Sequence, residues 1–298
     1  MTSTAAKPIR ILLQTTIPYA EDDWHVGRFS ALRDFIAGLR DEAGLPLAAV
    51  TSRDRETDAN GDDPVLSTID RSDYDQVWLI GVDTGGETGI SGGDCKGLSD
   101  FRRAGGAILS TRDHNDLGSS LCNLGGIGKA HYFHSVNPDP DPDRNRRDDP
   151  FTTTIDYPNY HSGSNGDVQR VAVTDAAHPV VRSDDGATIA TLPAHPHEGG
   201  VGAPPDDPTA RVLVTGTSQV THRPFNIAVA FDGSDGNGRG WAESTFHHFA
   251  DYNWDPRLGC PSFVSEPPSD ALVKKPSLLD DTKTYVRNLV RWLGRRSA

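Results

Sequence analysis

Residues 76–112, QVWLIGVDTGGETGISGGDCKGLSDFRRAGGAILSTR, contain the pattern that decides the fold of this chain. Two short apolar runs, 76–81 (QVWLIG) and 107–112 (AILSTR), have the length and composition of buried strands. Between them, residues 93–106 (GDCKGLSDFRRAGG) have the pattern of a helix that ends at glycines. Strand, helix and strand in this order predict a βαβ unit with parallel strands.

The same alternation is present toward the N-terminus. Residues 9–16 (IRILLQTT) and 47–51 (LAAVT) have the pattern of buried strands, and residues 27–44 (GRFSALRDFIAGLRDEAG) lie between them. This middle segment builds one apolar helical face from Leu32, Phe35, Ile36 and Leu39. Alternating strands and amphipathic helices predict a parallel sheet covered on both faces, with function at the carboxyl ends of the strands.

The second half of the chain contains closely spaced β-rich runs, which favour antiparallel strands added to the parallel sheet. These runs are residues 168–174, 187–192, 211–217, 226–233 and 240–246. The last segment, residues 278–296, predicts a helix that packs back on the sheet. We therefore expect a single α/β domain over residues 1–298, a three-layer sandwich with a mostly parallel central sheet and antiparallel strands in its C-terminal half.

Composition and charge exclude several classes of partner. The formal net charge of -13 opposes binding to phosphate backbones, and no dense basic run is present. The N-terminus lacks the apolar core of a signal peptide, and no apolar stretch approaches the length of a membrane span. The three cysteines, Cys95, Cys122 and Cys260, are odd in number and argue against a disulfide framework. The sequence predicts a cytoplasmic protein without nucleic-acid or membrane partners.

Residues 135–167 are rich in proline and aspartate (NPDPDPDRNRRDDP) and longer than a normal connection. This composition is too polar to pack, so we expect a solvated excursion. A lid over the site is the alternative.

Histidines and carboxylates follow predicted strands in four separate segments. The segments are residues 22–25 (DDWH), 111–116 (TRDHND), 193–198 (PAHPHE) and 246–253 (FHHFADYN). They supply Asp23, His25, Asp113, His114, Asp116, His195, His197, Glu198, His247, His248, Asp251 and Asn253. We expect these side chains to meet at one rim of the sheet.

The DHND turn resembles a nucleophile elbow but has no serine or cysteine at its apex. Asp113 or His114 would act there as base, nucleophile or metal ligand. The alternative is an aspartate that caps a helix beginning near Asp116. Asp23 has the same alternative as a helix cap, and His25 is the better functional candidate of its segment.

The other two segments indicate a metal site and its partner. An extended His-x-His places both imidazoles on one side of the chain, so His195 and His197, with Glu198, form a candidate metal site. The alternative is loop histidines bonded to backbone. In FHHF the adjacent histidines face opposite sides if the chain is extended, so one of His247 and His248 faces a pocket. Asp251 and Asn253 could orient that imidazole.

The chain resembles the class I glutamine amidotransferase-like superfamily, in its ThuA-like (trehalose utilisation) branch. The resemblance rests on the first strand with its histidine-bearing loop, on the block from YDQVWLIGVD to GGAILSTRDH, and on NIAVAFDGSDGNGRGWAESTFHHF. It implies a flavodoxin-like fold and a link to sugar metabolism. The amidotransferase cysteine would fall near Asp113 or His114, where no cysteine stands. The amidotransferase histidine would fall on His247 or His248, and the expected Pro-Glu does not follow, so glutaminase activity is not expected.

We expect an enzyme, a hydrolase or sugar-modifying enzyme, that acts on a sugar-like or other small polar substrate. Catalysis would use Asp113, His114, His247 and His248, while His25, Asp23, Asp116, Asn253 and Asp251 contact the substrate. A divalent metal, Zn, Mn or Fe, would bind at His195, His197 and Glu198. The glycine-rich stretches match no phosphate-binding motif, so no nucleotide cofactor is expected. The alternative is a non-catalytic carbohydrate-binding protein, and homo-oligomerisation is a further expectation.

Overall fold

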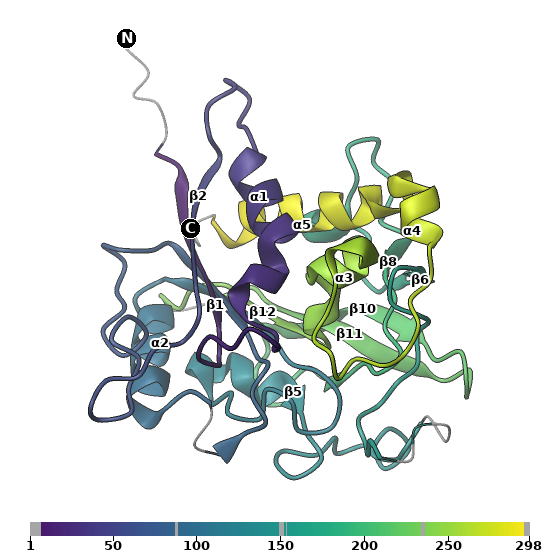
Figure 1. The fold of residues 1–298 in the computed structure, drawn as a ribbon. Coiled ribbons are helices and arrows are strands. Elements are labelled where there is room, and N and C mark those ends of the chain that lie inside the picture. Colours follow the sequence, from purple (N-terminus) through teal and green to yellow (C-terminus); the bar gives the residue numbers. More distant parts are fainter. Residues whose placement is uncertain (1–6, 87–88, 149–151, 153, 234–235, 295–298) are drawn as a thin grey trace.

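The computed structural model describes residues 7–86, 89–148, 152, 154–233 and 236–294. Within them the strands form an eight-stranded central sheet in the order β2-β1-β3-β4-β12-β11-β10-β7 (Figure 1). Its strands are β1 (Ile9–Thr15), β2 (Ala48–Arg53), β3 (Gln76–Ile80), β4 (Ala107–Thr111), β7 (Ala172–Val173), β10 (Ala210–Thr217), β11 (Pro224–Phe231) and β12 (Gly240–Glu243). Two small antiparallel pairs join β5 (His131–Tyr132) to β9 (Gly200–Val201), and β6 (Val168–Arg170) to β8 (Thr191–Pro193).

The sheet is parallel in one part and antiparallel in the other. β2, β1, β3, β4 and β12 run parallel to one another, although β12 comes from the C-terminal half of the chain. β11, β10 and β7 follow as antiparallel neighbours. The expected mostly parallel sheet with antiparallel strands added in the C-terminal half is therefore confirmed.

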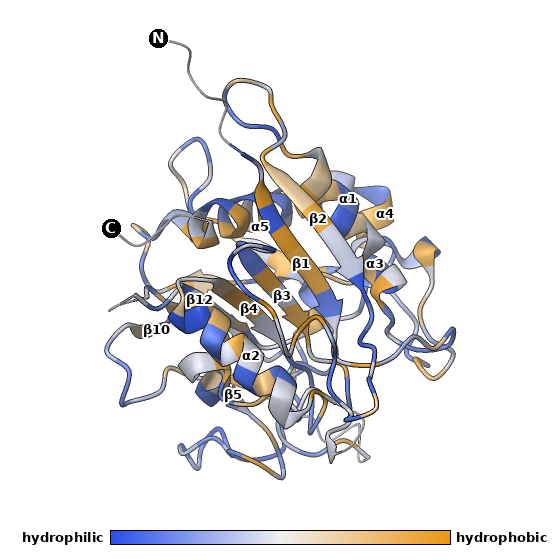
Figure 2. Cartoon of the chain, turned by 90° about the vertical axis from the view of Figure 1, so that its left-hand side faces the viewer, coloured by the Kyte–Doolittle hydropathy of each residue, from blue (hydrophilic) through white to orange (hydrophobic). Residues whose placement is uncertain are grey.

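Helices cover both faces of this sheet. The α-helices are α1 (Ser30–Gly38), α2 (Gly92–Arg103), α3 (Asp251–Trp254), α4 (Ala271–Lys274) and α5 (Asp280–Leu293). Short 3-10 helices are η1 (Val26–Phe29), η3 (Leu124–Ala130), η4 (Pro179–Val181), η5 (Phe246–His248), η6 (Pro256–Leu258) and η7 (Pro276–Leu279). Figure 2 shows α2 on one face of the apolar strands β3 and β4, with α1 and α5 beyond the sheet. Among the described residues, no helix is both long and apolar enough to cross a membrane.

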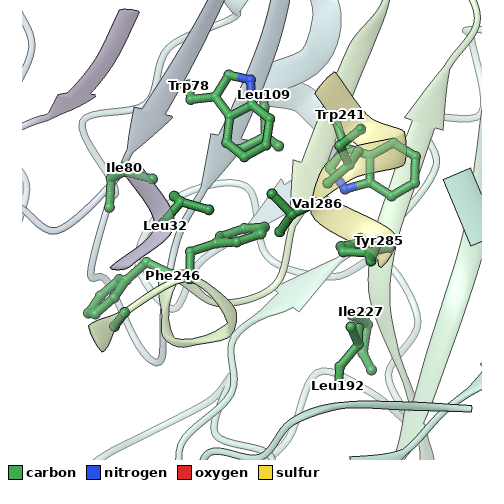
Figure 3. Packing of buried hydrophobic residues seen from close by; sticks show 14 of the residues in the cluster. Leu32, Trp78, Ile80, Leu109, Leu192, Ile227, Trp241, Phe246, Tyr285 and Val286 are labelled. Atoms are coloured by element: carbon green, nitrogen blue, oxygen red, sulfur yellow. The ribbon is translucent and has the colours of Figure 1, made fainter. Parts of the chain in front are cut away.

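Alternate residues of each buried strand feed two separate cores. In β3, Trp78 and Ile80 belong to the core on the side of α1 and α5, and Val77 and Leu79 belong to the core under α2. Figure 3 shows Trp78 in the first of these cores together with Val286 of α5. Because both faces are apolar, β1, β3 and β4 read as continuous hydrophobic runs in the sequence.

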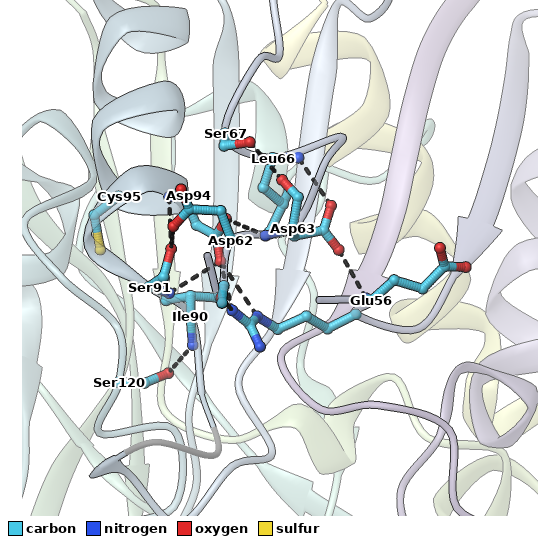
Figure 4. Close-up of polar contacts among 12 residues, drawn as sticks. Glu56, Asp62, Asp63, Leu66, Ser67, Ile90, Ser91, Asp94, Cys95 and Ser120 are labelled. Carbon is cyan, nitrogen blue, oxygen red and sulfur yellow. Dashed lines mark hydrogen bonds and ion pairs between the residues drawn. The ribbon is translucent and has the colours of Figure 1, made fainter. Parts of the chain in front are cut away.

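The helix α2 is fixed by polar contacts at its N-terminus (Figure 4). Ser91 and Asp94 form a reciprocal capping box, and the buried Arg55 pairs with Asp94 at 3.0 Å. Asp94 also accepts a hydrogen bond from the backbone of Asp63. These contacts tie the loop after β2 to the start of α2, so this acidic cluster is structural.

Three sequence expectations are wrong in detail. No helix begins near Asp116, because residues 115–120 form turns before η3. Cys95 of α2 and Cys122 form a disulfide, because packing of α2 against the segment before η3 brings their Cα atoms within 6.0 Å. The segment 135–167 is not simply solvated, because Tyr157 and Tyr160 are buried in the core on the side of α1 and α5.

Candidate functional site

The carboxyl ends of β1, β3, β4 and β12 surround one cavity of about 360 Å³. Its lining contains both polar and apolar side chains. The lining residues are Asp23, Trp24, Val82, Thr84, Asp113, His114, Leu117, Ile155, Asn165, His195, His197, His247, Phe263, Val264 and Glu266. Parallel strands place their carboxyl ends at the same edge of the sheet, which is why residues so far apart in sequence meet here.

Asp113 lines the cavity and lies two residues after the end of β4. It is fully buried, and its Oδ1 accepts a hydrogen bond of 2.7 Å from Thr245 Oγ1. Its Oδ2 lies 2.7 Å from His114 Nδ1 but makes no hydrogen bond of acceptable geometry. A buried carboxylate oxygen without a donor is costly unless a cation or a bound donor is near it.

Two more imidazoles point their Nε2 atoms at the same oxygen. His195 Nε2 lies 3.6 Å and His247 Nε2 3.7 Å from Asp113 Oδ2. The two rings stack with centroids 3.5 Å apart and planes inclined by 13°. Asp113, His195 and His247 each offer one atom that could donate a lone pair to a metal ion, and these three atoms lie within 4.8 Å of one another. All three residues are buried, and we call them the three-donor group.

Asparagine side chains fix which ring nitrogen of these histidines carries the proton. Asn253 Nδ2 donates to Ala194 O and to Asn165 Oδ1, so Asn253 Oδ1 faces His247 Nδ1 at 2.7 Å. Asn165 Oδ1 in turn lies 2.9 Å from His195 Nδ1. Because both amide oxygens can only accept, Nδ1 of each histidine is the donor, and each Nε2 presents a lone pair to the cavity. This is the arrangement that outer-shell partners give to metal-ligating histidines.

Burial keeps these imidazoles neutral. It lowers the pKa of His195 to about 4. Burial and the neighbouring His195 lower the pKa of His247 well below its ordinary value. Two Nε2 lone pairs and a carboxylate oxygen thus converge, and a bound cation would relieve their mutual repulsion.

A divalent ion fits among these three donors. Two ligands at about 2.1 Å from a tetrahedral ion are about 3.4 Å apart, close to the separations of 3.6 and 3.7 Å seen here. Two histidines and one carboxylate leave further positions of the ion open, as in catalytic zinc sites and in non-haem Fe(II) enzymes.

A second polar pair lines the cavity beside this group. His197 Nε2 lies 3.1 Å from Glu266 Oε1, and His197 Nδ1 lies 2.9 Å from Asn159 Oδ1. The rings of His114 and His197 are 5.5 Å apart. His197 therefore contacts the cavity but pairs with Glu266, outside the three-donor group.

Glu198 and His248 lie together in a buried network instead of in the cavity. His248 Nδ1 lies 2.7 Å from Glu243 Oε1, and His248 Nε2 lies 3.6 Å from Glu198 Oε2. Burial would lower the pKa of His248, but the two carboxylates raise it to about 10. Glu243 also accepts from Trp241 Nε1 and Tyr285 OH, and Ser244 Oγ donates to Glu198. η5 is helical and not extended, and its adjacent histidines still diverge: His247 lines the cavity, and His248 lies in the buried network.

Of the remaining sequence candidates, Asp23 lines the cavity and the others are not among its lining residues. His25 caps η1 by accepting from the backbone of Gly27. Asp116 accepts from the backbone of Ser135, and Asp251 accepts from the backbone of Ser30 and Ala31 at the start of α1. Asn253 touches His247 and does not line the cavity.

Sequence reasoning missed Asn159, Asn165 and Glu266, which contact the site histidines. The two asparagines come from the segment 135–167, in the stretch YPNYHSGSN that follows its proline- and aspartate-rich part. Glu266 comes from the coil between η6 and α4. Uncharged amides in a loop give no signal until the histidines that they contact are placed.

No protein-family model matches the chain, and no curated protein matches it in sequence. Solved structures do match. The mmIFT52 N-terminal domain is 12% identical, with 97% of this chain and 99% of that chain covered and a TM-score of 0.53. At this identity the likeness shows the fold alone.

Two further matches are of the kinds named by the sequence resemblance. A ThuA-like protein from Bacteroides uniformis ATCC 8492 is 11% identical over 98% of this chain and 95% of that chain, with a TM-score of 0.48. The CTPS glutaminase domain of Trypanosoma brucei, with bound acivicin, is 12% identical over 97% and 96%, with a TM-score of 0.44. The predicted fold class itself is confirmed by the sheet order and layers described above.

Proposed function

We propose that this protein is a metal-dependent enzyme that acts on a small, polar, sugar-like substrate. The observation that carries the proposal is the convergence of Asp113, His195 and His247, with both Nε2 lone pairs aimed at a buried carboxylate oxygen. In the neighbouring network His248 Nδ1 has a carboxylate partner at 2.7 Å, Glu243 Oε1, whereas Asp113 Oδ2 makes no hydrogen bond.

In this proposal Asp113, His195 and His247 hold one divalent ion, which is Zn, Mn or Fe. Such an ion supplies Lewis acidity to a substrate oxygen or to water. Thr245 orients Asp113, while Asn165 and Asn253 hold the two imidazoles in the metal-binding tautomer. His114 and His197 line the same cavity and offer further donors and acceptors to a substrate.

The proposal includes neither glutaminase activity nor a nucleotide cofactor. No thiol is among the described residues that line the cavity, so the thiolate attack of amidotransferases has no nucleophile here. The link to sugars rests on the sequence resemblance and on the size of the cavity, at the lower end of the range of about 300–1,000 Å³ for small-molecule sites.

Elemental analysis of protein purified without chelators tests the proposal. We expect close to one Zn, Mn or Fe per chain and loss of that metal in the double variant His195→Ala/His247→Ala. The control is His134→Ala, an exposed histidine outside the cavity, which should keep the metal. Metal-free wild-type protein that also fails to take up Zn²⁺, Mn²⁺ or Fe²⁺ would reject the metalloenzyme. If such protein still binds sugars, the non-catalytic binding protein is the better assignment.

The proposed location is the cytoplasm. A disulfide such as Cys95–Cys122 is uncommon in that compartment. Fractionation of the source cells tests the location, and alkylation of free thiols in the same fractions tests whether the disulfide forms there.

A further inference from the structure

The charges around the cavity are all of one sign. Its lining includes three carboxylates, Asp23, Asp113 and Glu266, and no lysine or arginine among the described residues. The internal residues outside the description, 87–88, 149–151, 153 and 234–235, contain no lysine or arginine in the sequence either. A cavity that binds phosphate or carboxylate groups normally offers a guanidinium or an ammonium to them.

The histidines of the three-donor group do not replace these missing cations. Asparagine oxygens accept from Nδ1 of His195 and of His247, so each Nε2 presents a lone pair and offers no donor to an anion. A divalent ion at Asp113 would not neutralise the other two carboxylates of the lining, Asp23 and Glu266. An anionic group on the ligand would therefore meet repulsion wherever it lies away from the ion.

The buried cation next to Asp113 in the sequence, Arg112, makes its contacts outside the cavity lining. Arg112 is fully buried, stacks over the ring of Phe133 at 4.2 Å and donates to the backbone oxygen of Asn115. A Cβ added at Gly199 would lie 2.5 Å from Arg112 Nη1, so the guanidinium occupies the space left by that glycine. It is not among the residues that line the cavity.

Apolar side chains also line the cavity. They include Trp24, Val82, Leu117, Phe263 and Val264, and Phe263 is 61% exposed. Apolar side chains of this kind can cover the C–H face of a ring whose oxygens point toward the three-donor group. The coil that bears Phe263 is held in place by Ser262, whose backbone N–H donates to Asp22 Oδ1 at 2.6 Å.

We propose that the cavity selects uncharged, hydroxylated ring molecules and rejects their phosphorylated or carboxylated counterparts, with Asp23 and Glu266 as the specificity-determining residues. The inference rests on the proposed function in that it concerns the substrate of the same site. It also constrains the reaction that supplies the substrate, which must deliver a molecule free of phosphate, such as the product of a glycoside or phosphate-ester hydrolysis.

Binding of matched probe pairs tests this inference. The probes are D-glucose and myo-inositol against D-glucose 6-phosphate, D-glucuronate and myo-inositol 1-phosphate, measured by saturation-transfer NMR and calorimetry on protein as purified and after addition of Zn²⁺, Mn²⁺ or Fe²⁺. We expect a neutral member to bind and its anionic counterparts to bind at least tenfold more weakly. Equal or tighter binding of an anionic probe overturns the inference, and so does the failure of every neutral probe to bind.

Charge-neutralising variants identify the residues responsible. Glu266→Gln and Asp23→Asn should each reduce the ratio of neutral-probe affinity to anionic-probe affinity by about five- to tenfold, as expected for one charge at a separation of several ångströms. Asp206→Asn makes the same change in net charge at an exposed site that pairs with Lys129, and should leave this affinity ratio unchanged. An unchanged affinity ratio in both cavity variants refutes the assignment of these residues.

The outcome for ligand selectivity can be distinguished from the outcome for metal binding, on which the proposed function depends. Metal content is measured on the same samples. Protein that is metal-free but prefers neutral probes would reject the metalloenzyme and keep the selectivity. Protein that holds one metal but binds anionic probes as well as neutral ones would do the reverse.

Discussion

Replacing Asn253 by leucine should weaken metal binding although Asn253 does not touch the metal position. The side chain accepts from His247 Nδ1 at 2.7 Å and is itself fixed by two donated hydrogen bonds. Leucine has a similar volume but no acceptor, so His247 loses the partner that keeps its Nε2 unprotonated and aimed at Asp113. Outer partners of this kind contribute about 10- to 100-fold to metal affinity.

The size of the effect can be worked out as a shift in melting temperature. A metal present at 100 times its Kd stabilises the folded state by about 2.7 kcal/mol. For 298 residues the entropy of unfolding is about 0.6 kcal/mol/K, so the wild-type Tm should rise by about 4 °C. At the same metal concentration, a tenfold weaker variant should gain about 2 °C and a 100-fold weaker one less than about 1 °C.

Differential scanning calorimetry of chelator-treated and metal-loaded samples measures these shifts. Comparing each variant with its own metal-free form removes the stability that Asn253→Leu loses through its missing hydrogen bonds. The matched control is Asn288→Leu, which also loses two donated hydrogen bonds, here to the backbone oxygens of Val180 and Arg182, at a residue outside the cavity lining. A metal-induced shift in Asn253→Leu equal to that of the wild type would refute the role assigned to this asparagine.

Four further substitutions probe buried ionisable groups and glycines of the fold. Glu198→Gln removes one carboxylate beside the buried His248 and should lower the free energy of unfolding by about 3–5 kcal/mol in urea titrations. It should leave the metal content intact, and loss of metal would show that Glu198 is a ligand after all. Burial lowers the pKa of His178 to about 4, so the unfolded chain binds its proton first as the pH falls. Wild type should therefore lose stability relative to His178→Gln between about pH 6.5 and 4, by at most about 1.4 kcal/mol per pH unit, and parallel pH profiles would contradict this. Gly199→Ala places a Cβ 2.6 Å from Asp113 O and should cost about 1–3 kcal/mol of stability. Gly38→Ala in α1, where a Cβ meets nothing within 4 Å, should instead stabilise by about 0.5–1 kcal/mol, and thermal unfolding compares the two.

The sheet and its helices could be predicted because their signals are local. The apolar runs at 9–16, 76–81 and 107–112 became β1, β3 and β4, and the helical spacing of Leu32 and Ile36 became α1. Burial on both faces leaves no choice of residue type along such strands, so the pattern is visible in one dimension.

The sequence by itself therefore determined the layers, the strand ends and the residue types available at the rim of the sheet. Tertiary structure alone decided which of those residues meet. The turn of η5 sends His247 into the cavity and His248 into the core, and segment 135–167 returns Asn159 and Asn165 to the histidines. Side-chain direction at a loop or strand end depends on a few backbone angles and on distant partners, and neither is encoded in the periodicity of a single segment.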